Sequence, residues 1–330
     1  MKTVLSVHRE AWPMTAPFAI TGYVFDSLDC VVVALREGDC VGRGEGVGVY
    51  YFNETSSSML EQIEAVRAQI ENGISRSELQ ELLPPGGARN ALDCALWDLE
   101  VKKSGKSIWE LTGIEAKPAR TAFTIGIGKT PDAMAEKAAR ARNYPFLKIK
   151  LDSVDPVERV AAIRKARPDA VIIVDANQGF SFELLQSVLG PLADLGVAMV
   201  EQPLKRGADE ELSRFKSPIP LCADESCLHR GELPDALERY DMINIKLDKS
   251  GGLTEALAIA KEAREAGKRL MVGNMLGTSL SMAPAFVIAQ LCDFVDLDGP
   301  LNIKSDYVCG MIYEDGKVCA PQKGFWGTPT

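Results

Sequence analysis

Lysine and acidic residues stand at the ends of several short apolar runs in the middle of this 330-residue sequence. Lys148 and Lys150 are two residues apart, so on a strand both side chains would lie on one face. Asp296 and Asp298 repeat this spacing with acids. Each of the remaining charged residues follows its own apolar run: Asp175, Glu201, Asp224 and Lys246. Charged residues in so regular a position are typical of a chemical site.

The three single carboxylates have the chemistry of a metal site. Carboxylates brought to one spot raise each other's pKa unless a cation lies among them. Ligands that are all oxygen suit a hard ion, and an ion that keeps open positions for a substrate is typically Mg2+. The sequence therefore predicts Asp175, Glu201 and Asp224 as magnesium ligands.

The lysines have the chemistry of acid–base groups. Removing a proton next to a carboxylate adds charge to an anion, and a divalent metal with a nearby ammonium stabilises the enediolate that forms. A lysine acts as a base near neutral pH when a metal and other lysines lower its pKa. Inversion at carbon requires one base on each face, and Lys150 and Lys246 are the two candidates.

The elements that must position these residues follow from the rhythm of the sequence. After Pro118, short β-rich runs alternate with seven helical segments such as 156–167 and 253–266, which predicts a parallel sheet of βα units. The eight predicted strands are 121–127, 146–151, 171–175, 197–201, 220–224, 242–247, 269–272 and 294–298. Eight strands predict a TIM-like barrel with its site at the carboxyl ends of the strands. The second and sixth strands lie opposite each other in such a ring, and no convincing helix follows the eighth strand, so we expect a (β/α)7β barrel.

The N-terminal part predicts a separate α+β capping domain over residues 1–117, with the barrel over 118–301. The expected elements are a first strand at 1–8, a hairpin of 31–35 with 41–46, and helices at 56–72 and 87–104. The tail, residues 302–330, is expected to fold back onto the cap. The repeat Gly42-x-Gly44-x-Gly46-x-Gly48 lacks the lysine and context of a phosphate loop, so we interpret it as a flexible loop.

Each charged motif taken alone has an ordinary structural explanation. Lys148-x-Lys150 could be a solvated strand end, Asp175-Ala-Asn177 a helix cap, and the acids near 296–298 a turn. Their joint placement on successive strand ends favours a site. His8 and His229 lie away from the strand ends and are interpreted as structural or surface groups.

Composition excludes several classes of function. The chain has 37 basic and 46 acidic residues, and its net charge of -9 argues against nucleic acid or an anionic membrane as partner. No apolar run reaches about 20 residues, so no membrane span is predicted. The eight cysteines contain no C-x-x-C pair and predict neither a zinc site nor a disulfide framework. We expect a cytoplasmic enzyme with a small-molecule substrate.

The motifs taken together resemble the muconate-lactonizing subgroup of the enolase superfamily. The resemblance rests on Lys148-Ile-Lys150, Asp175-Ala-Asn177, Glu201-Gln-Pro203, Ala223-Asp224-Glu225-Ser226, Asn244-Ile-Lys246 with Gly251-Gly252, and the run from Ala91 to Asp98. It covers nearly the whole chain. It implies Mg2+ on the three carboxylates, Lys150 and Lys246 as the bases, and Lys148 as the group that neutralises the enolate oxygen. Self-association is a family-level expectation.

The eighth strand distinguishes among the reactions of this subgroup. Asp296-Leu-Asp298-Gly-Pro resembles the motif with which dipeptide epimerases bind the α-ammonium of a dipeptide, and carboxylates suit a cation. The resemblance implies an isomerase that transfers a proton at the α-carbon of the C-terminal residue of an L-Ala-L/D-Xaa dipeptide. The alternative is an N-acylamino acid racemase or a cycloisomerase or dehydratase of the same subgroup.

The loops that would contact the substrate side chain depart from the family pattern. Epimerases of glutamate dipeptides generally carry an arginine in the first mobile loop, whereas residues 10–35 contain neither lysine nor arginine. The predicted substrate-binding residues of the two loops are Thr21, Tyr23, Asp26 and Tyr51, with Phe25, Tyr50 and Phe52 beside them. Our hypothesis is a preference for dipeptides whose C-terminal residue is uncharged, aromatic or basic.

Overall fold

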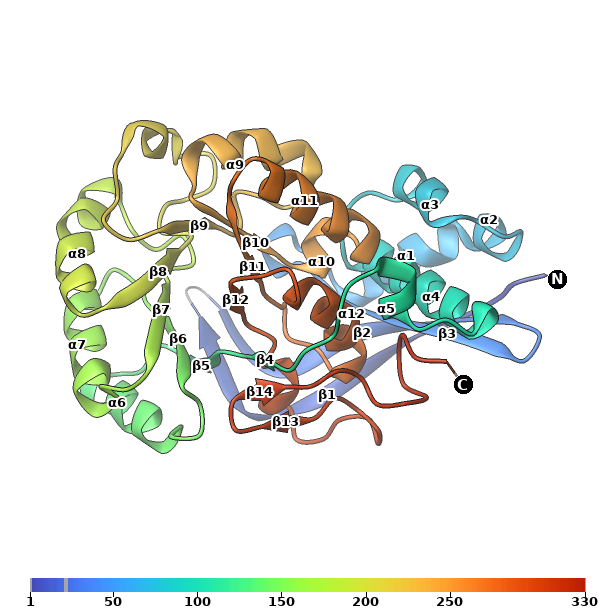
Figure 1. The fold of residues 1–330 in the computed structure, drawn as a ribbon, viewed down its shortest axis with the longest axis horizontal. Helices are drawn as coiled ribbons and strands as arrows, with labels where there is room; N and C mark the ends of the chain where they lie inside the picture. Colours follow the sequence, from blue (N-terminus) through green and yellow to red (C-terminus); the bar gives the residue numbers. More distant parts are fainter. Residues whose placement is uncertain (1, 21–22, 330) are drawn as a thin grey trace.

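The computed structural model describes residues 2–20 and 23–329, and the side chains of all of these except residues 18–20. Its strands form three sheets: an antiparallel sheet in the order β1-β2-β3, a parallel sheet that runs in sequence order from β5 to β12, and a small antiparallel sheet of β13, β14 and β4. Figure 1 shows most helices of the parallel sheet on the left and along the top, and the N-terminal sheet and helices on the right.

The N-terminal unit packs helices on one three-stranded sheet. Its elements are β1 (Val4–Ile20), β2 (Tyr23–Glu37), β3 (Cys40–Val47), the 3-10 helix η1 (Tyr50–Phe52), α1 (Ser56–Ala65), α2 (Arg67–Glu71), α3 (Arg76–Leu82), α4 (Gly87–Ser104) and α5 (Ile108–Thr112). The predicted hairpin and the predicted helix 87–104 are confirmed, and Gly105 ends that helix in the left-handed conformation. The predicted helix 56–72 is interrupted at Val66, whose ψ of 9° leaves the helical region.

The interpretation of the glycine repeat as a flexible loop is wrong. Gly42, Gly44 and Gly46 lie in β3, which packs directly on α4. A Cβ at these positions would lie 2.3, 2.1 and 2.1 Å from backbone oxygens of α4. The repeat therefore allows the strand and the helix to approach more closely than any side chain would permit.

The second unit is a barrel of strands and helices in alternation. Its elements are β5 (Phe123–Ile125), α6 (Pro131–Arg140), β6 (Phe146–Lys150), α7 (Pro156–Ala166), β7 (Val171–Asp175), α8 (Phe182–Asp194), β8 (Val197–Glu201), η2 (Glu210–Arg214), β9 (Leu221–Ala223), η3 (Arg230–Glu232), α9 (Leu233–Arg239), β10 (Met242–Ile245), α10 (Leu247–Ser250), α11 (Leu253–Glu265), β11 (Arg269–Val272), α12 (Ser279–Ala289) and β12 (Phe294–Val295). The bounds predicted for β7, β8 and β11 are confirmed. Between β8 and β9 the described chain forms a 3-10 helix where an α-helix was expected.

The strands alternate between two surfaces, as the barrel requires. Leu147 and Ile149 of β6 pack against the surrounding helices, whereas Phe146 points into the barrel. The barrel interior is filled by one apolar cluster with a residue from each of seven strand positions: Ala122, Phe146, Ile173, Met199, Cys222, Met242 and Met271. This cluster closes the barrel below the carboxyl ends of the strands.

Hydrogen bonds join the first and last strands of the parallel sheet. The amide of Ala122 donates to the carbonyl of Val295 at 2.8 Å, and the amide of Thr124 donates to Asp298 Oδ2 at 2.9 Å. Within the described chain no α-helix follows β12, and the short 3-10 helix η4 (Gly299–Asn302) takes its place. The predicted (β/α)7β barrel with a capping unit is confirmed.

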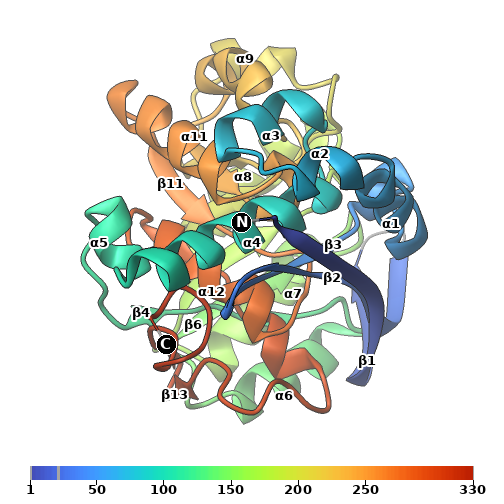
Figure 2. The same cartoon turned by 90° about the vertical axis from the view of Figure 1, so that its right-hand side faces the viewer.

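The C-terminal tail runs back across both units. Its strands β13 (Tyr313–Glu314) and β14 (Lys317–Val318) pair with β4 (Ala119–Arg120). Trp326 Nε1 donates to the carbonyl of Cys94 in α4 at 3.0 Å, and the tail lies below α4 in Figure 2. The domain boundaries at 117 and 301 stay a prediction. No helix in the described part of the chain is long and apolar enough to cross a membrane.

Candidate active site

The charged residues lie directly above the apolar cluster in the barrel. Because strand side chains alternate, the residue two positions beyond each member of the cluster also points into the barrel. This rule gives one layer made of Thr124, Lys148, Asp175, Glu201, Asp224, Asn244 and Gly273, with Asp296 two positions beyond Phe294. A further step of two gives eight positions, of which five line one pocket: Lys150, Asn177, Lys246, Met275 and Asp298. The alternation of the strands therefore builds the site.

Lys148 is the central cation of the layer. Its side chain is 2% exposed, and its Nζ lies 3.0 Å from Asp175 Oδ2, 2.8 Å from Glu201 Oε2 and 2.9 Å from Asp296 Oδ2. The contact with Glu201 has the distance of an ion pair without the direction of a hydrogen bond, so Glu201 Oε2 has no hydrogen-bond partner. One ammonium thus bridges three strands of the barrel.

Lys150 and Lys246 line the same pocket from distant strands. Lys150 Nζ donates to Asp175 Oδ2 at 2.6 Å and to Asn177 Oδ1 at 2.9 Å. Lys246 Nζ donates to Asp224 Oδ2 at 2.7 Å. Lys150 ends β6 and Lys246 follows β10, four strands further along the sheet. The pocket between them therefore has an ammonium on either side.

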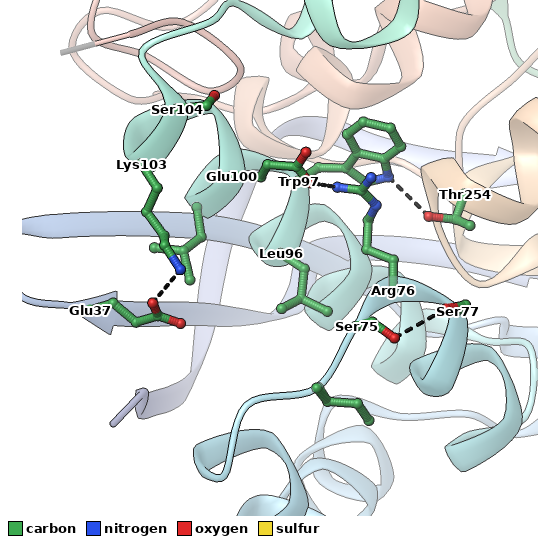
Figure 3. A pocket seen from close by; sticks show the side chains of 12 residues that line it. Glu37, Ser75, Arg76, Ser77, Leu96, Trp97, Glu100, Lys103, Ser104 and Thr254 are labelled. Carbon is green, nitrogen blue, oxygen red and sulfur yellow. Dashed lines mark hydrogen bonds and ion pairs between the residues drawn. The ribbon is translucent and has the colours of Figure 1, made fainter. Parts of the chain in front are cut away.

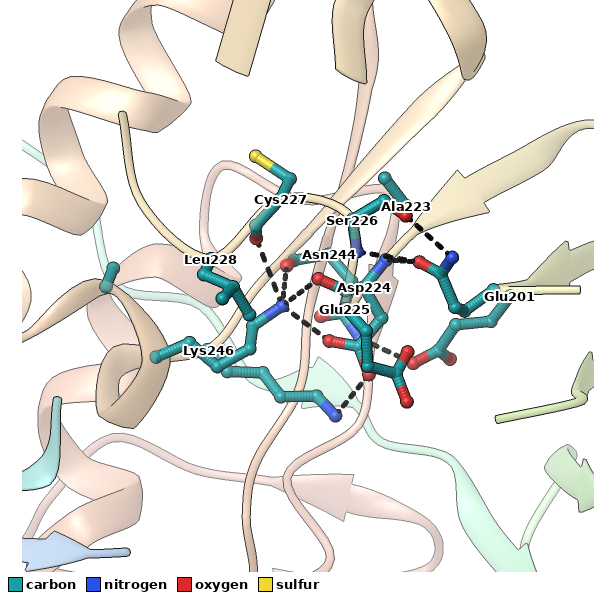
Figure 4. Close-up of polar contacts among 12 residues, drawn as sticks. Glu201, Ala223, Asp224, Glu225, Ser226, Cys227, Leu228, Asn244 and Lys246 are labelled. Carbon is teal, nitrogen blue, oxygen red and sulfur yellow. Dashed lines mark hydrogen bonds and ion pairs between the residues drawn. The ribbon is translucent and has the colours of Figure 1, made fainter. Parts of the chain in front are cut away.

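Asp224 has a second lysine partner that the sequence analysis missed. Figure 4 shows the polar contacts around Asp224 and Lys246. Lys249 is fully buried on α10, and its Nζ donates to Asp224 Oδ1 and also to the carbonyl of Asp224. The carbonyls of Asn244 and Cys227 accept further hydrogen bonds from Lys249 at 3.2 and 3.3 Å. Two lysines that follow β10 therefore hold the carboxylate of Asp224 in position.

The lysines divide the buried carboxylates into two kinds. Burial alone would raise the pKa of Asp175, but Lys150 and Lys148 overcome it and hold this pKa below its usual range. The pKa of Asp224 is likewise lowered, by Lys246 and Lys249, against the effect of burial. Burial and the nearby Asp175 raise the pKa of Glu201 to about 7. The layer thus holds two firmly ionised carboxylates beside one that binds a proton readily.

Neighbouring carboxylates set the direction of two lysine pKa values. The pKa of Lys148 and that of Lys246 are raised, and the lowering that the sequence analysis expected from a bound metal and nearby lysines stays a prediction. Burial acts to lower both, but Asp296 in the first case and Asp224 in the second favour the charged form more strongly. In this arrangement the carboxylates face the ammonium groups directly, which explains the direction.

The three carboxylates have the oxygen atoms that a hard cation prefers, although they are not gathered around one point. Among the residues that the structure describes, no three acidic, histidine or cysteine side chains cluster closely enough to hold an ion. Instead, Lys148 lies between Asp175 and Glu201, and Lys246 lies against Asp224. The donor set is all oxygen, it comes from three consecutive strands, and Glu201 Oε2 is buried without a hydrogen bond. These features suit Mg2+.

Asp296 and Asp298 line the same pocket from the end of the eighth strand. Asp296 Oδ1 is buried and has no hydrogen-bond partner, while its Oδ2 accepts from Lys148. Asp298 Oδ2 accepts from the amide of Thr124, and burial together with Asp296 raises the pKa of Asp298 to about 6. Asn274 Nδ2 donates to the carbonyl of Asp296 at 2.6 Å. The pocket therefore has an unused anionic acceptor at this end.

The cap contributes aromatic side chains to the pocket. Phe25 and Tyr50 line it, and their ring centroids are 5.4 Å apart. Tyr23 packs edge-on against Tyr50 but is 43% exposed. Asp26, the residue after Phe25 in β2, is also exposed. Tyr51 packs beside Tyr50, and its hydroxyl is buried without a hydrogen-bond partner.

The other residues predicted from the loops are not part of the described pocket lining. Thr21 lies outside the described residues. Tyr23, Asp26 and Tyr51 are absent from the described lining of the pocket, and their role in substrate binding stays a prediction.

Several buried polar residues were missed by the sequence analysis. The amide side chain of Gln202 bridges two strand ends, because its Oε1 accepts from the amides of Asp224 and Ser226. Asn244 Nδ2 donates to Glu201 Oε1 at 2.8 Å. Asn177 lines the pocket as the partner of Lys150. Asn177, Gln202 and Asn244 stand in motifs that the sequence analysis quoted without giving these residues a role, and Lys249 was not singled out.

A second hollow lies on the cap, away from the strand ends (Figure 3). The Arg76 guanidinium lies 3.4 Å from the ring centroid of Trp97 and pairs with Glu100. Lys103 pairs with Glu37. Its two described cations are each paired with an acid, and the hollow shows no buried acid–base pair. We therefore place the candidate active site in the barrel.

Comparisons with known proteins agree with this architecture. Residues 2–113 match the family described as "Mandelate racemase / muconate lactonizing enzyme, N-terminal domain", and residues 132–323 match "Enolase C-terminal domain-like". The chain is 45% identical to the L-Ala-D/L-Glu epimerase of Escherichia coli, over 96% of this chain and 99% of that protein. It is 41% identical to the N-acetyl-D-glutamate racemase of a Pseudoalteromonas species, over 90% and 95%.

Solved structures give the same picture. An enolase family member from Agrobacterium tumefaciens, with sodium and L-Ala-L-Glu bound, aligns with a TM-score of 0.95 at 42% identity and covers 98% of this chain and 100% of its own. The dipeptide epimerase of Enterococcus faecalis, in complex with Mg and L-Leu-L-Tyr, aligns with a TM-score of 0.91 at 28% identity and covers 99% of both chains.

Proposed function

The chain belongs to the mandelate racemase/muconate lactonizing enzyme family of the enolase superfamily, and from this premise we propose that it is a magnesium-dependent dipeptide epimerase. The reaction is 1,1-proton transfer at the α-carbon of the C-terminal residue of a dipeptide. The observation that carries the proposal is a pocket with lysines on two sides and an unpartnered buried carboxylate oxygen at one end. The relatives named as epimerases, and the relatives with bound dipeptides, support it.

Lys150 and Lys246 are the two acid–base groups of the proposal. A substrate whose α-carbon lies between them presents its proton to one lysine, which removes it as a base. The opposite lysine, in its protonated form, then delivers a proton to the other face, and the configuration inverts. Lys148 stays in place beneath them, where its ammonium offsets the negative charge that the carboxylate gains as the enediolate forms.

Asp175, Glu201 and Asp224 would hold the Mg2+ ion. When bound, the ion supplies positive charge that stabilises the developing negative charge of the substrate carboxylate. Lys249 and the side chain of Gln202 keep Asp224 in position through the hydrogen bonds to its carboxylate and its amide. The magnesium found with the Enterococcus faecalis relative supports this assignment.

Asp296 separates the leading function from its alternative. A dipeptide has a free α-ammonium, which would bind the unpartnered Oδ1 of Asp296 at the end of the pocket. An N-acylamino acid has no positive charge there, so the buried carboxylate would face a neutral amide. Because one relative, 41% identical, is named as an N-acetyl-D-glutamate racemase, the experiment below also tests racemisation of N-acylamino acids.

The test is proton NMR of the purified protein with Mg2+ in D2O. The substrates are L-Ala-L-Xaa dipeptides and the N-acetyl derivatives of the same C-terminal residues. We expect the α-proton signal of the C-terminal residue to disappear and the other diastereomer to form, with exchange lost when EDTA removes the metal. Exchange of the N-acetyl amino acids without exchange of any dipeptide would replace the proposal with the racemase.

The setting of the enzyme is also part of the proposal. The net charge of -9 supports the absence of a nucleic-acid or anionic membrane partner. We also propose a cytoplasmic location and, from family expectation, self-association. Size-exclusion chromatography with light scattering measures the last of these directly.

A further inference from the structure

An aromatic wall from the cap closes the pocket opposite the charged layer. We define it as Phe25 at the start of β2 and Tyr50 in η1, both of which line the pocket. Tyr23 and Tyr51 support it, since their ring centroids lie 4.4 and 5.0 Å from that of Tyr50 in edge-on geometry. The wall is therefore a packed aromatic surface that borders the pocket.

The position of a bound dipeptide follows from the groups already described. Its carboxylate belongs with the charged layer, its reacting carbon lies between Lys150 and Lys246, and its ammonium lies at Asp296. The remaining substituent of the reacting carbon is the C-terminal side chain, which must point away from the charged layer. The described surface on that side is the wall of Phe25 and Tyr50.

No described cation of the pocket is free to bind a second carboxylate. The lysines among its described lining residues are Lys148, Lys150 and Lys246, and each is held by at least one buried aspartate. The described lining contains no arginine. A glutamate side chain would thus place an unpaired charge against aromatic rings, which is costly in a buried site.

We propose, on the basis of the proposed function, that the wall of Phe25 and Tyr50 selects dipeptides with a bulky uncharged C-terminal side chain, aliphatic or aromatic, over dipeptides that end in glutamate. This goes beyond the name of the 45% identical relative, which is an L-Ala-D/L-Glu epimerase. It also sharpens the hypothesis drawn from the sequence, because it names the residues that select the side chain.

The substrate test compares kcat/KM for L-Ala-L-Leu, L-Ala-L-Phe, L-Ala-L-Gln, L-Ala-L-Glu and L-Ala-L-Lys. We expect the leucine and phenylalanine peptides to exceed the glutamate peptide by about tenfold or more, since burial of an apolar side chain favours them. The glutamine peptide has nearly the shape of the glutamate peptide without its charge, and it should be the better of the two.

The variant test supplies the cation that the wall lacks. Phe25→Arg should raise the ratio of kcat/KM for L-Ala-L-Glu to that for L-Ala-L-Leu by about tenfold or more. The matched control is Phe52→Arg. Phe52 lies in η1 with Tyr50, is 52% exposed and lies outside the described lining of the pocket, so the ratio of this variant should stay near the wild-type value. Circular dichroism melting checks that both variants fold.

Each outcome has a definite meaning. A wild-type preference for the glutamate peptide, or equal rates for all side chains, overturns the inference while leaving the epimerase intact. An equal shift of the ratio by both arginine variants also overturns it, because position in the pocket would then not matter. No exchange with any dipeptide contradicts the proposed function itself, so the two failures can be told apart.

Discussion

At the scale of single residues, the site is a set of buried charges that balance one another. Lys148 contacts Asp175, Glu201 and Asp296 within 3.0 Å, so no member of this group stands alone. Desolvation of each charge is offset by its partners, and loss of one partner leaves another exposed to the full cost of burial. Changes to these residues should therefore alter binding and catalysis more than the size of the side chain suggests.

The acceptor at the end of the pocket gives a prediction at this scale. Asp296→Asn keeps the shape but removes the negative charge, so kcat/KM for L-Ala-L-Leu should fall by about 10- to 100-fold, the value of a charged hydrogen bond. The matched comparison is the same peptide with an acetylated amino group, measured by the same NMR exchange. The variant should lose less with that peptide, and an equal loss with both would contradict an ammonium at Asp296.

The strand-end acids and lysines could be predicted from the sequence because each follows an apolar run of strand length. The residues that approach from elsewhere could not. Lys249 reaches Asp224 from a one-turn helix, and Phe25 enters the pocket where Tyr23 and Asp26 do not. Both depend on how a turn and a hairpin twist in three dimensions, which no spacing in the sequence records.

At the scale of elements, glycines allow neighbouring strands, helices and side chains to approach closely. Gly273 follows β11, and a Cβ there would lie 2.9 Å from Lys246 Cε and 2.9 Å from the side-chain amide of Asn244. The glycine thus leaves the room in which the end of the Lys246 side chain lies. The same principle explains the glycine repeat of β3, which the sequence analysis interpreted wrongly because a loop and a close-packed strand both favour glycine.

A glycine substitution tests this at the element scale. Gly273→Ala should displace the Lys246 ammonium and lower kcat by about 100-fold, the usual cost of misplacing a catalytic group by about 1 Å. Gly190→Ala is the matched control, since no heavy atom outside its own stretch of α8 lies within 4 Å of the new Cβ. Steady-state kinetics should show the control at wild-type kcat. Full activity in the Gly273 variant would refute this account of the packing.

The sequence predicted the buried strands of the barrel better than the short helices of the cap. The strands β7, β8 and β11 begin and end where the pattern predicts, because each is a buried run with clear breaks. The helices α3 and α5 were missed although each begins with a capping box, Ser75 with Glu78 and Ser107 with Glu110. They are five to seven residues long, too short for periodicity to mark them.

At the scale of the whole molecule, buried polar contacts join the cap to the barrel. Glu45 of β3 accepts hydrogen bonds from the amide and the hydroxyl of Thr278, at the start of α12. Asp248 of α10 accepts from the amide of Val47 and from Asn90 Nδ2 at 2.9 and 2.7 Å. These contacts also hold the wall of Phe25 and Tyr50 over the pocket, because both residues belong to the cap while the lysines belong to the barrel.

The buried contact between Glu45 and Thr278 predicts a pH dependence of the free energy of unfolding. Burial raises the pKa of Glu45 from 4.5 to about 8, so the folded state binds more protons than the unfolded state between these values. The contribution of Glu45 to stability is complete below about pH 4.5 and is lost as the pH rises through about 8. Glu45→Gln imitates the protonated form, and it should gain on the order of 1–3 kcal/mol over the wild type between pH 5 and pH 9.

Urea unfolding at the two pH values measures this difference. Glu61→Gln, on the exposed side of α1, is the control and should follow the wild type at both values. A difference between Glu45→Gln and the wild type that does not change with pH would contradict the assignment.

The most direct test of the central claim separates the two lysines. Lys150→Gln and Lys246→Gln are each incubated in D2O with Mg2+ and with either diastereomer of Ala-Leu, and the α-proton is followed by NMR. We predict that neither variant inverts the α-carbon at a measurable rate, and that each exchanges the α-proton of only one diastereomer, with opposite choices. Loss of exchange with both diastereomers in one variant and full epimerisation by the other would contradict a two-base mechanism.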